Sequence, residues 1–175
     1  ARAIDYIYVD TGAMYRGVTL FALRRGFIRE GVIQEAELRE ALNEVSLSFR
    51  QSHEGATPEL YLNGENVEKE IRTMEVASFV SPIAALAFVR EFLTAQQQAF
   101  GTEGGIVMDG RDIGTAVFPQ AELKVFVTAD PVIRAERRLA ELRGKGDSKI
   151  TLEEVLENLR QRDYIDTHRE VAPLR

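Results

Sequence analysis

Short apolar runs alternate with amphipathic stretches along the chain, and this pattern predicts an α/β fold. Residues 6–9 and 106–108 are apolar runs of strand length, and each ends in an acid followed by a glycine-containing turn. Behind the first of these runs, apolar side chains recur at helical spacing: Met14, Val18 and Phe21. Strand, polar turn and helix in this order form half of a βαβ unit.

The helix signals and the middle of the chain refine this prediction. We expect Thr11 to be the N-cap of the first helix and Gly26 to end it. Residues 34–44 predict a short helix, and residues 46–51 alternate like an antiparallel strand. Asn63-Gly64 between apolar positions is a strong signal for a two-residue hairpin turn.

Ser81-Pro82 is expected to open a long helix over about residues 82–99, since proline is tolerated in a first turn. From residue 105 the α/β rhythm returns, with strands predicted at 105–109 and 123–127. Asp130-Pro131 predicts the start of a further helix, and Thr151 to Glu154 has the form of a capping box. Together the elements predict a parallel sheet flanked by helices, with a small antiparallel insert.

Composition narrows the class of protein. The 175 residues suit one domain, and no apolar run approaches the roughly 20 residues that a membrane span needs. The chain has no cysteine, which excludes disulfides and cysteine-ligated metals and fits a cytoplasmic protein. The net charge of −6 argues against partners such as nucleic acid or an anionic membrane. Two histidines far apart, His53 and His168, support neither a catalytic triad nor a zinc site.

Candidate chemistry gathers where the two predicted parallel strands end. Asp10 and Asp109 follow these strands, and ligands of open α/β folds bind beyond the carboxyl ends of the strands. Arginines lie just behind both acids and elsewhere in the chain: Arg16, Arg72, Arg90, Arg111, Arg137, Arg138, Arg162 and Arg169. Arginine binds phosphate through paired hydrogen bonds, and carboxylates suit Mg²⁺ or a sugar hydroxyl. The pattern predicts a phosphorylated, nucleotide-like ligand, with scattered surface arginines as the alternative.

Five stretches resemble consecutive motifs of the bacterial cytidylate (CMP) kinase family: VDTGAMYRGVTL, NGENVEKEIRTMEVASFVSPIAA, VMDGRDIGTAVFP, LKVFVTADPVIRAERR and RQRDYIDTHREVAPL. They occur in the family's order and cover nearly the whole chain. The resemblance implies a P-loop nucleoside-monophosphate-kinase-like fold that transfers the γ-phosphoryl group of ATP, with Mg²⁺, to CMP or dCMP. It also implies a core at 1–44 and 100–175, a monophosphate-binding insert at about 45–99, a lid at about 137–162, and a monomer.

The resemblance assigns the acceptor site residue by residue. It implies that the acceptor site is lined by Thr11, Tyr15 and Arg16, with Arg16 on the CMP phosphate. Ser81 and Arg90 would read the edge of the cytosine, and Arg111 would reach the phosphate. Asp112 would accept a hydrogen bond from the cytosine 4-amino group. A carboxylate there would repel the carbonyl that uracil presents at the same position.

The remaining assignments concern the tail, the lid and the metal. The tail matches the family's RDxxDxxR pattern, which implies ribose and phosphate contacts for three residues: Arg162, Asp166 and Arg169. Arg137 and Arg138 match lid arginines that contact ATP. Asp10 lies where the family keeps an acid near Mg²⁺ and the phosphates, while Asp109 is either a phosphate-side acid or a partner for an arginine. The implied catalytic set is Asp10, Arg16, Arg111 and Arg162.

One departure from the family stands out. The Gly-x-x-x-x-Gly-Lys-Ser/Thr loop that cradles ATP phosphates occurs nowhere in the 175 residues. We expect that the given chain leaves out the ends of the family domain, so that these residues alone should not catalyse efficiently. Two alternatives stay open: a non-catalytic module that binds pyrimidine nucleotides, and a kinase for another small acceptor such as UMP.

Overall fold

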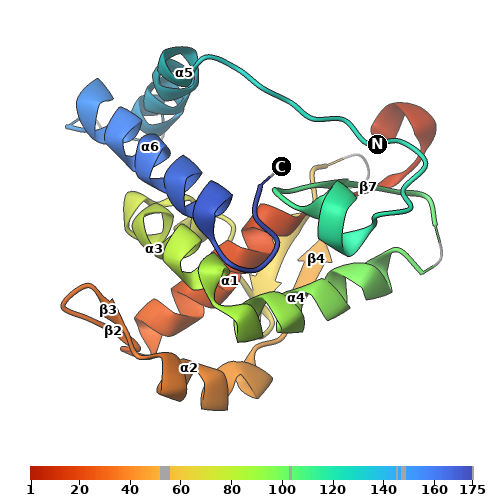
Figure 1. Ribbon diagram of the computed structural model, residues 1–175, viewed down its shortest axis with the longest axis horizontal. Helices are drawn as coiled ribbons and strands as arrows, with labels where there is room; N and C mark the ends of the chain where they lie inside the picture. Colours follow the sequence, from red (N-terminus) through yellow and green to blue (C-terminus); the bar gives the residue numbers. More distant parts are fainter. Residues whose placement is uncertain (52–55, 103, 145, 147–148, 175) are drawn as a thin grey trace.

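Two parallel strands carry the acids that the sequence analysis singles out. The computed structural model describes residues 1–51, 56–102, 104–144, 146 and 149–174. After a 3-10 turn, η1 (Arg2–Ile4), strand β1 (Ile7–Asp10) pairs in parallel with β7 (Ile106–Asp109). Asp10 is the register partner of Asp109, so the two predicted acids end neighbouring strands at the same level. Strand β7 is labelled in Figure 1.

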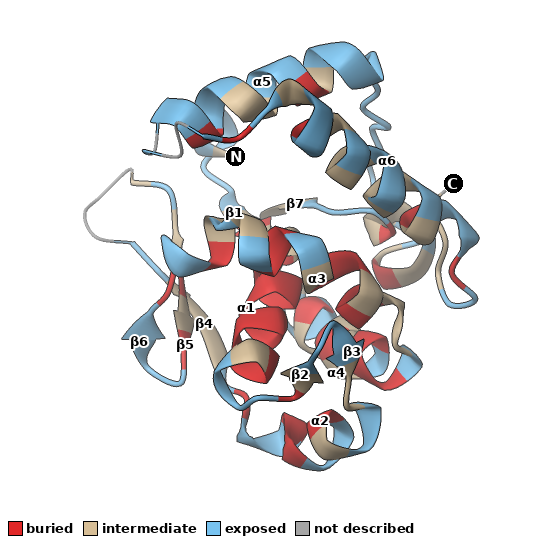
Figure 2. Ribbon diagram, turned by 90° about the vertical axis from the view of Figure 1, so that its left-hand side faces the viewer, coloured by how far each residue is buried: buried red, intermediate tan, exposed pale blue. Residues whose placement is uncertain are grey.

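Helix α1 (Thr11–Arg24) runs through the centre of the molecule and is buried along most of its length (Figure 2). Its N-cap is Asp10, whose carboxylate accepts a hydrogen bond from the Ala13 amide at 2.9 Å. The prediction of Thr11 as the N-cap is therefore wrong. Thr11 is already helical, and its hydroxyl donates to the Asp109 carbonyl at 2.6 Å, which joins the start of α1 to the end of β7.

The antiparallel insert forms as predicted. A short ribbon and a helix precede it: β2 (Ile28–Arg29), β3 (Val32–Ile33), α2 (Glu35–Ala41) and the 3-10 turn η2 (Leu42–Glu44). The insert is a three-stranded sheet of β4 (Leu47–Arg50), β5 (Glu59–Leu62) and β6 (Glu65–Asn66). Asn63 and Gly64 have φ angles of 50° and 86°, which confirms the predicted two-residue turn. Leu60 and Leu62 of this sheet join one apolar core with α1, α3 and α4, so the insert packs directly on α1.

The predicted helix over 82–99 is two helices. After the 3-10 turn η3 (Glu70–Arg72), α3 (Met74–Ala85) begins behind the N-cap Thr73, and α4 (Ala87–Phe100) follows at an angle of 94°. Pro82 therefore lies inside α3, and the predicted start of the helix at this residue is wrong. Proline cannot donate a backbone hydrogen bond, and the chain leaves the helical conformation at Leu86. Arg90 of α4 donates to the Ala84 carbonyl at 3.0 Å and bonds across this bend.

The second apolar cluster joins α5 (Pro131–Gly144) to α6 (Leu152–His168), which lie side by side over α3 (Figure 1). The predicted starts of both helices are confirmed. Asp130 accepts a hydrogen bond from the Val132 amide, and Thr151 with Glu154 forms a complete capping box. The predicted lid spans this helix pair. Its residues 145, 147 and 148 lie outside the described residues, and the lid and insert boundaries stay predictions.

The predicted strand at 123–127 is wrong. Behind the π-helical turn η4 (Ile113–Val117) this segment runs extended towards α5 without strand pairing (Figure 1). Its side chains are exposed, with 79% of Leu123 and 85% of Val127 accessible. A strand needs a hydrogen-bonded neighbour, and no strand within the described ranges lies along this segment. The segment has the composition of a strand but pairs with no strand of the described residues.

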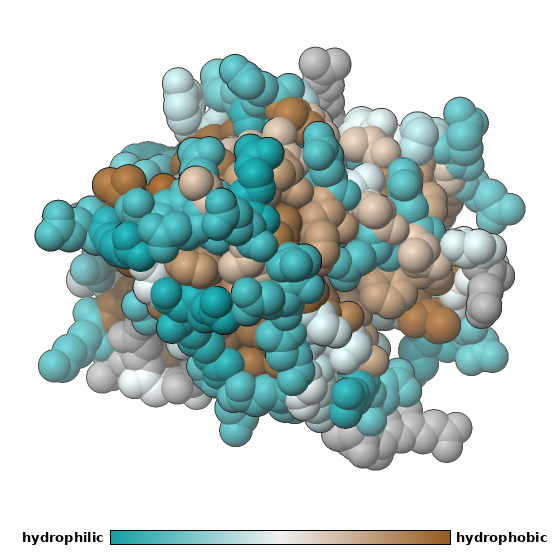
Figure 3. Space-filling view, turned by 90° about the horizontal axis from the view of Figure 1, so that it is seen from below, coloured by the Kyte–Doolittle hydropathy of each residue, from teal (hydrophilic) through white to brown (hydrophobic). Residues whose placement is uncertain are grey.

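The lengths and compositions of the helices show whether any of them could cross a membrane. Among the described residues no single helix is long and apolar enough to cross a membrane, although the bent pair α3–α4 passes the same test of length and composition. Buried residues of both helices belong to the main apolar core. Hydrophilic side chains interleave with apolar ones on the face shown in Figure 3.

Candidate active site

Two carboxylates mark the edge of the parallel pair. Asp10 accepts a hydrogen bond from Arg72 at 2.7 Å through Oδ2, while its Oδ1 caps α1. Burial raises the pKa of Asp109, and the nearby charge of Asp10 raises it further. Burial also raises the pKa of Tyr8, whose side chain lies against Asp109. The edge therefore holds one acid in an ion pair with Arg72 and one whose charged form is disfavoured by burial and by its neighbour.

Arginines from five separate segments converge beside these acids, and we call Arg16, Arg72, Arg111, Arg138 and Arg162 the arginine cluster. Arg16 donates to the Ile71 carbonyl at 3.0 Å. Burial lowers the pKa of Arg16 to about 9, and the charges of Arg162 and Arg72 act in the same direction. Burial likewise lowers the pKa of Arg162, and Arg111 and Arg138 repel its charge. The Nε of Arg162 is enclosed and has no hydrogen-bond partner among the described residues.

Such a cluster has a direct chemical consequence. Several cations lie close together in a partly desolvated place, which disfavours their charged forms. An anion with several acceptor oxygens would relieve both the repulsion and the unmade hydrogen bonds. The arrangement therefore suits a phosphate group.

A buried ion pair lies in the next part of the site. Arg90 and Asp112 are 2% and 3% exposed, and Nη2 of Arg90 donates to Oδ2 of Asp112. The guanidinium also lies over the Tyr15 ring, 5.3 Å from its centre. Ser81 of α3 is buried as well. The Oδ1 of Asp112 makes no hydrogen bond to the described part of the chain, which leaves an acceptor for a ligand.

Asp166 connects the end of α6 to the loop after β7. Its Oδ2 accepts from Arg111 Nε at 2.9 Å, and its Oδ1 accepts from Arg169 Nη1 at 3.3 Å. Arg169 also donates twice to the Ala172 carbonyl, at 2.9 and 2.7 Å. Burial lowers the pKa of Arg169, and the charge of Arg90 lowers it further. The tail residues thus stand between the arginine cluster and the Arg90–Asp112 pair.

The two predicted lid arginines separate. Arg138 donates to the Arg72 carbonyl at 3.1 Å and to Glu141 at 2.9 Å, and so belongs to the arginine cluster. Arg137 is exposed on α5 and is not brought to the other candidate residues. Contacts and nearby charges link most of the other predicted site residues in one continuous region: Asp10, Thr11, Tyr15, Arg16, Arg90, Asp109, Arg111, Asp112, Arg162, Asp166 and Arg169. Ser81 is buried in α3, and its part in the site stays a prediction.

Sequence reasoning left two features unassigned. Arg72 had no firm role, yet it bonds Asp10 and Glu68; its only signal was its place in the Glu-Ile-Arg part of the second motif. Arg134 of α5 pairs with Asp163 of α6 at 2.6 and 3.0 Å and ties the helix pair together. No spacing rule connects residues 29 positions apart, so no sequence signal could have found this pair.

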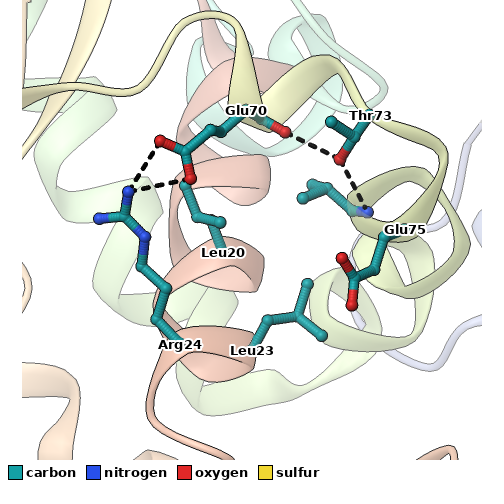
Figure 4. A pocket seen from close by; sticks show the side chains of 7 residues that line it. Leu20, Leu23, Arg24, Glu70, Thr73 and Glu75 are labelled. Carbon is teal, nitrogen blue, oxygen red and sulfur yellow. Dashed lines mark hydrogen bonds and ion pairs between the residues drawn. The ribbon is translucent and has the colours of Figure 1, made fainter.

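One further pocket lies outside this region, between α1, η3 and α3 (Figure 4). Its lining is Leu20, Leu23, Arg24, Glu70, Thr73, Glu75 and Val76. The charge of Arg24 is already compensated, because Glu65 and Glu70 each accept hydrogen bonds from it. This pocket therefore offers no cation like Arg16 or Arg162, neither of which forms an ion pair within the described part of the chain.

The donor set at the strand edge fits a hydrated magnesium ion. Within the described residues no group of three or more histidines or acids is placed to hold a metal ion. Mg²⁺ commonly binds through one or two carboxylates and keeps several waters. Asp10 and Asp109 can supply such a pair, since they are register partners at the strand ends.

Comparison with known proteins gives the family. The profile of the cytidylate kinase family matches residues 1–175. Cytidylate kinases of Porphyromonas gingivalis and Bacteroides thetaiotaomicron are each 59% identical over 175 residues, covering all of this chain and 76% of the relative. That of Flavobacterium johnsoniae is 53% identical over 174 residues, covering 99% of this chain and 75% of the relative. The helices around the parallel pair and the small antiparallel sheet agree with a P-loop kinase fold, and the chain belongs to the cytidylate kinase family of nucleoside monophosphate kinases.

Proposed function

We propose that this protein transfers the γ-phosphoryl group of ATP to CMP or dCMP and so forms CDP or dCDP. The observation that carries the proposal is the arginine cluster next to the buried Arg90–Asp112 pair. The cluster supplies cations for a phosphate, and the pair supplies an acceptor for an amino group. A nucleoside monophosphate with an amino-bearing base presents both groups.

The acceptor phosphate would lie on Arg16, Arg111 and Arg162. Its oxygen is already a nucleophile at neutral pH, so the reaction needs no general base. A bond forms between this oxygen and the γ-phosphorus, the bond to the β–γ bridging oxygen breaks, and ADP leaves. The contribution of the protein is alignment and compensation of charge on the transferring group, which guanidinium groups provide.

The base would be recognised at the Arg90–Asp112 pair, next to the Tyr15 ring. Asp112 would accept a hydrogen bond from the cytosine 4-amino group, with Ser81 and Arg90 on the same edge of the base. Uracil presents a carbonyl oxygen where cytosine presents this donor, and two acceptors repel. Thr11, Asp166 and Arg169 would complete the contacts to ribose and phosphate.

ATP and Mg²⁺ would meet this site from the side of the strand edge. Bound Mg²⁺ neutralises charge on the transferring phosphates. Asp10 and Asp109 would hold its water shell, and Arg138 would approach the ATP phosphates from α5, with Arg137 joining as the lid closes. A closed lid would also keep water from competing with CMP for the phosphoryl group.

The partners follow from the same proposal. They are the small nucleotides CMP, dCMP and ATP, with no nucleic acid or membrane, for a monomer in the cytoplasm. Lys and Arg together number 22 against 28 Asp and Glu, and this acidic balance supports the absence of a nucleic-acid partner.

Calorimetric titration with CMP, UMP and AMP tests the acceptor. CMP binding clearly tighter than UMP binding supports the proposal, while equal affinities would remove Asp112 from base recognition. Chromatography of mixtures with MgATP and CMP then tests transfer. We expect the 175 residues to bind CMP but to turn over slowly, since they lack the glycine-lysine loop. Turnover at a rate usual for kinases, about 1–100 s⁻¹, would contradict this expectation. CMP binding without any transfer, even in a longer chain that includes the loop, would favour the non-catalytic module.

A further inference from the structure

Three enclosed polar groups lie behind the Arg90–Asp112 pair and have no part in the proposed chemistry. They are the Tyr15 hydroxyl, the Gln97 amide and the Nε of Arg90, and none makes a hydrogen bond of ordinary geometry within the described ranges. Gln97 is 0% exposed. Buried polar side chains in proteins are nearly always hydrogen-bonded, so this concentration calls for a physical explanation.

The spacing along α4 explains how these groups are related. Arg90 and Gln97 are seven residues apart, which puts them on the same face of the helix about 10 Å from each other. Tyr15 of α1 spans this distance. Its ring lies under the Arg90 guanidinium, and its hydroxyl lies by the Gln97 amide.

The packing around Gln97 leaves few possible hydrogen-bond partners for its amide. Leu93, between the two polar residues on the same face, is 0% exposed, and Tyr15 itself is 7% exposed. Because Gln97 is not exposed to water, the neighbouring Tyr15 hydroxyl is a candidate hydrogen-bond partner for its amide.

We infer that Gln97 is a positioning residue for base selection: its amide holds the Tyr15 hydroxyl, and the Tyr15 ring fixes the Arg90 guanidinium against Asp112. This inference rests on the proposed function. Arg90 has two further bonds, to the Ala84 carbonyl and to Asp112, and both need the guanidinium in one plane. If the Tyr15 ring could turn freely, the Arg90 guanidinium would no longer be held in this orientation. The Asp112 carboxylate would then no longer present a fixed oxygen to the base.

The test compares Gln97→Leu with Gln96→Leu in calorimetric titrations with CMP and UMP. Gln96 is the matched control, because it lies on the same helix outside the fully buried face and bonds to no other described residue. Gln97→Leu should lower the ratio of CMP to UMP affinity about tenfold. Gln96→Leu should keep the ratio of the unaltered protein. Gln97→Glu, which retains an acceptor oxygen, should restore most of it.

Each outcome decides a separate question. If the unaltered protein does not prefer CMP, the proposed function fails irrespective of Gln97. If it prefers CMP and Gln97→Leu keeps that ratio while unfolding at lower temperature, Gln97 is merely structural and the inference is overturned. If Gln97→Leu does not fold, Tyr15→Phe removes the same hydrogen bond from the other side. That variant must lose selectivity to a similar extent, and a folded Tyr15→Phe with the original ratio overturns the inference.

Discussion

Arg90 donates a hydrogen bond to Asp112 in a place that is almost closed to water, with their side chains only 3% and 4% exposed. The two residues come from different elements, α4 and the loop after β7. A buried ion pair of this kind contributes little net stability, but removing one partner leaves a buried charge uncompensated. Under the proposed function, the pair would couple the stability of this region to the recognition of a base.

Asp112→Asn is expected to change base preference. The amide can donate to the uracil carbonyl, which the carboxylate repels, so the ratio of CMP to UMP affinity should fall by about 10- to 100-fold. The folded protein should also lose about 3–5 kcal/mol of unfolding free energy, because Arg90 keeps its charge without a counterion. Calorimetric titration and denaturant unfolding measure the two effects. An unchanged ratio would show that Asp112 serves only as the counterion of Arg90.

Arg162→Met is expected to separate stability from binding. Arg162 is repelled by Arg111 and has an unpaired buried Nε, so its removal should leave the unfolding free energy of the free protein unchanged or higher. Loss of a charged hydrogen bond to the phosphate should weaken CMP binding by about 10- to 100-fold. Arg160→Met is the control, because Arg160 is exposed on the same helix. If both variants bind CMP equally well, the arginine cluster does not hold the phosphate.

How far the sequence could predict the fold depends on how local each signal is. Asn63-Gly64 and the Thr151–Glu154 box act within a few residues, and both predictions are confirmed. The break at Leu86 has no glycine or proline at its own position, and the helix that contains Pro82 begins eight residues earlier, at Met74. The segment 123–127 has strand composition, but a strand is defined by its neighbour.

In the candidate site, too, local signals could be predicted from the sequence and tertiary contacts could not. The motif resemblance predicts residues that the structure brings together, apart from Arg137, which is exposed on α5, and Ser81, for which only burial is shown. It could not find Arg72 or Gln97, because their roles depend on tertiary contacts to Asp10 and Tyr15. Asp10 shows a further reason: one carboxylate caps a helix through one oxygen and pairs with an arginine through the other. The motif implies the acid, but the cap depends on which residue ends β1, and the sequence pattern predicts Thr11 for it.

The pH dependence of stability should differ in sign between Asp109 and Asp163. Burial raises the pKa of Asp109, so the folded protein binds its proton more tightly than the unfolded chain does. Its ionisation therefore costs stability as the pH rises from its ordinary pKa through the raised one. The hydrogen bond from Arg134 lowers the pKa of Asp163, so this acid stabilises the fold above its ordinary pKa and loses that effect as the pH falls.

Asn variants of both acids, unfolded by denaturant between about pH 2 and pH 7, measure this difference, because the Asp163 effect is lost below its ordinary pKa and the Asp109 effect appears above it. Asp109→Asn should become more stable relative to the unaltered protein as the pH rises. Asp163→Asn should become less stable over the same range. Both effects should stay near or below about 1 kcal/mol, because water reaches both side chains. Parallel curves for the two variants would contradict the assignment of opposite pKa shifts.

Gly110→Ala is expected to damage the site through the backbone. A Cβ at this position would collide with the Thr11 hydroxyl and would lie 2.9 Å from Ile113, where the chain turns from Asp109 to Arg111. Relief of this crowding must move the loop or break the hydrogen bond from Thr11 to Asp109, at a cost of about 1–3 kcal/mol. Either movement displaces Arg111 and Asp112, so CMP affinity should fall together with stability. Gly144→Ala is the matched control: it meets no atom within 4 Å at the end of α5 and should be neutral or slightly stabilising. Gly110→Ala with the affinity and stability of the unaltered protein would mean that the close approach of Thr11 does not hold this loop in place.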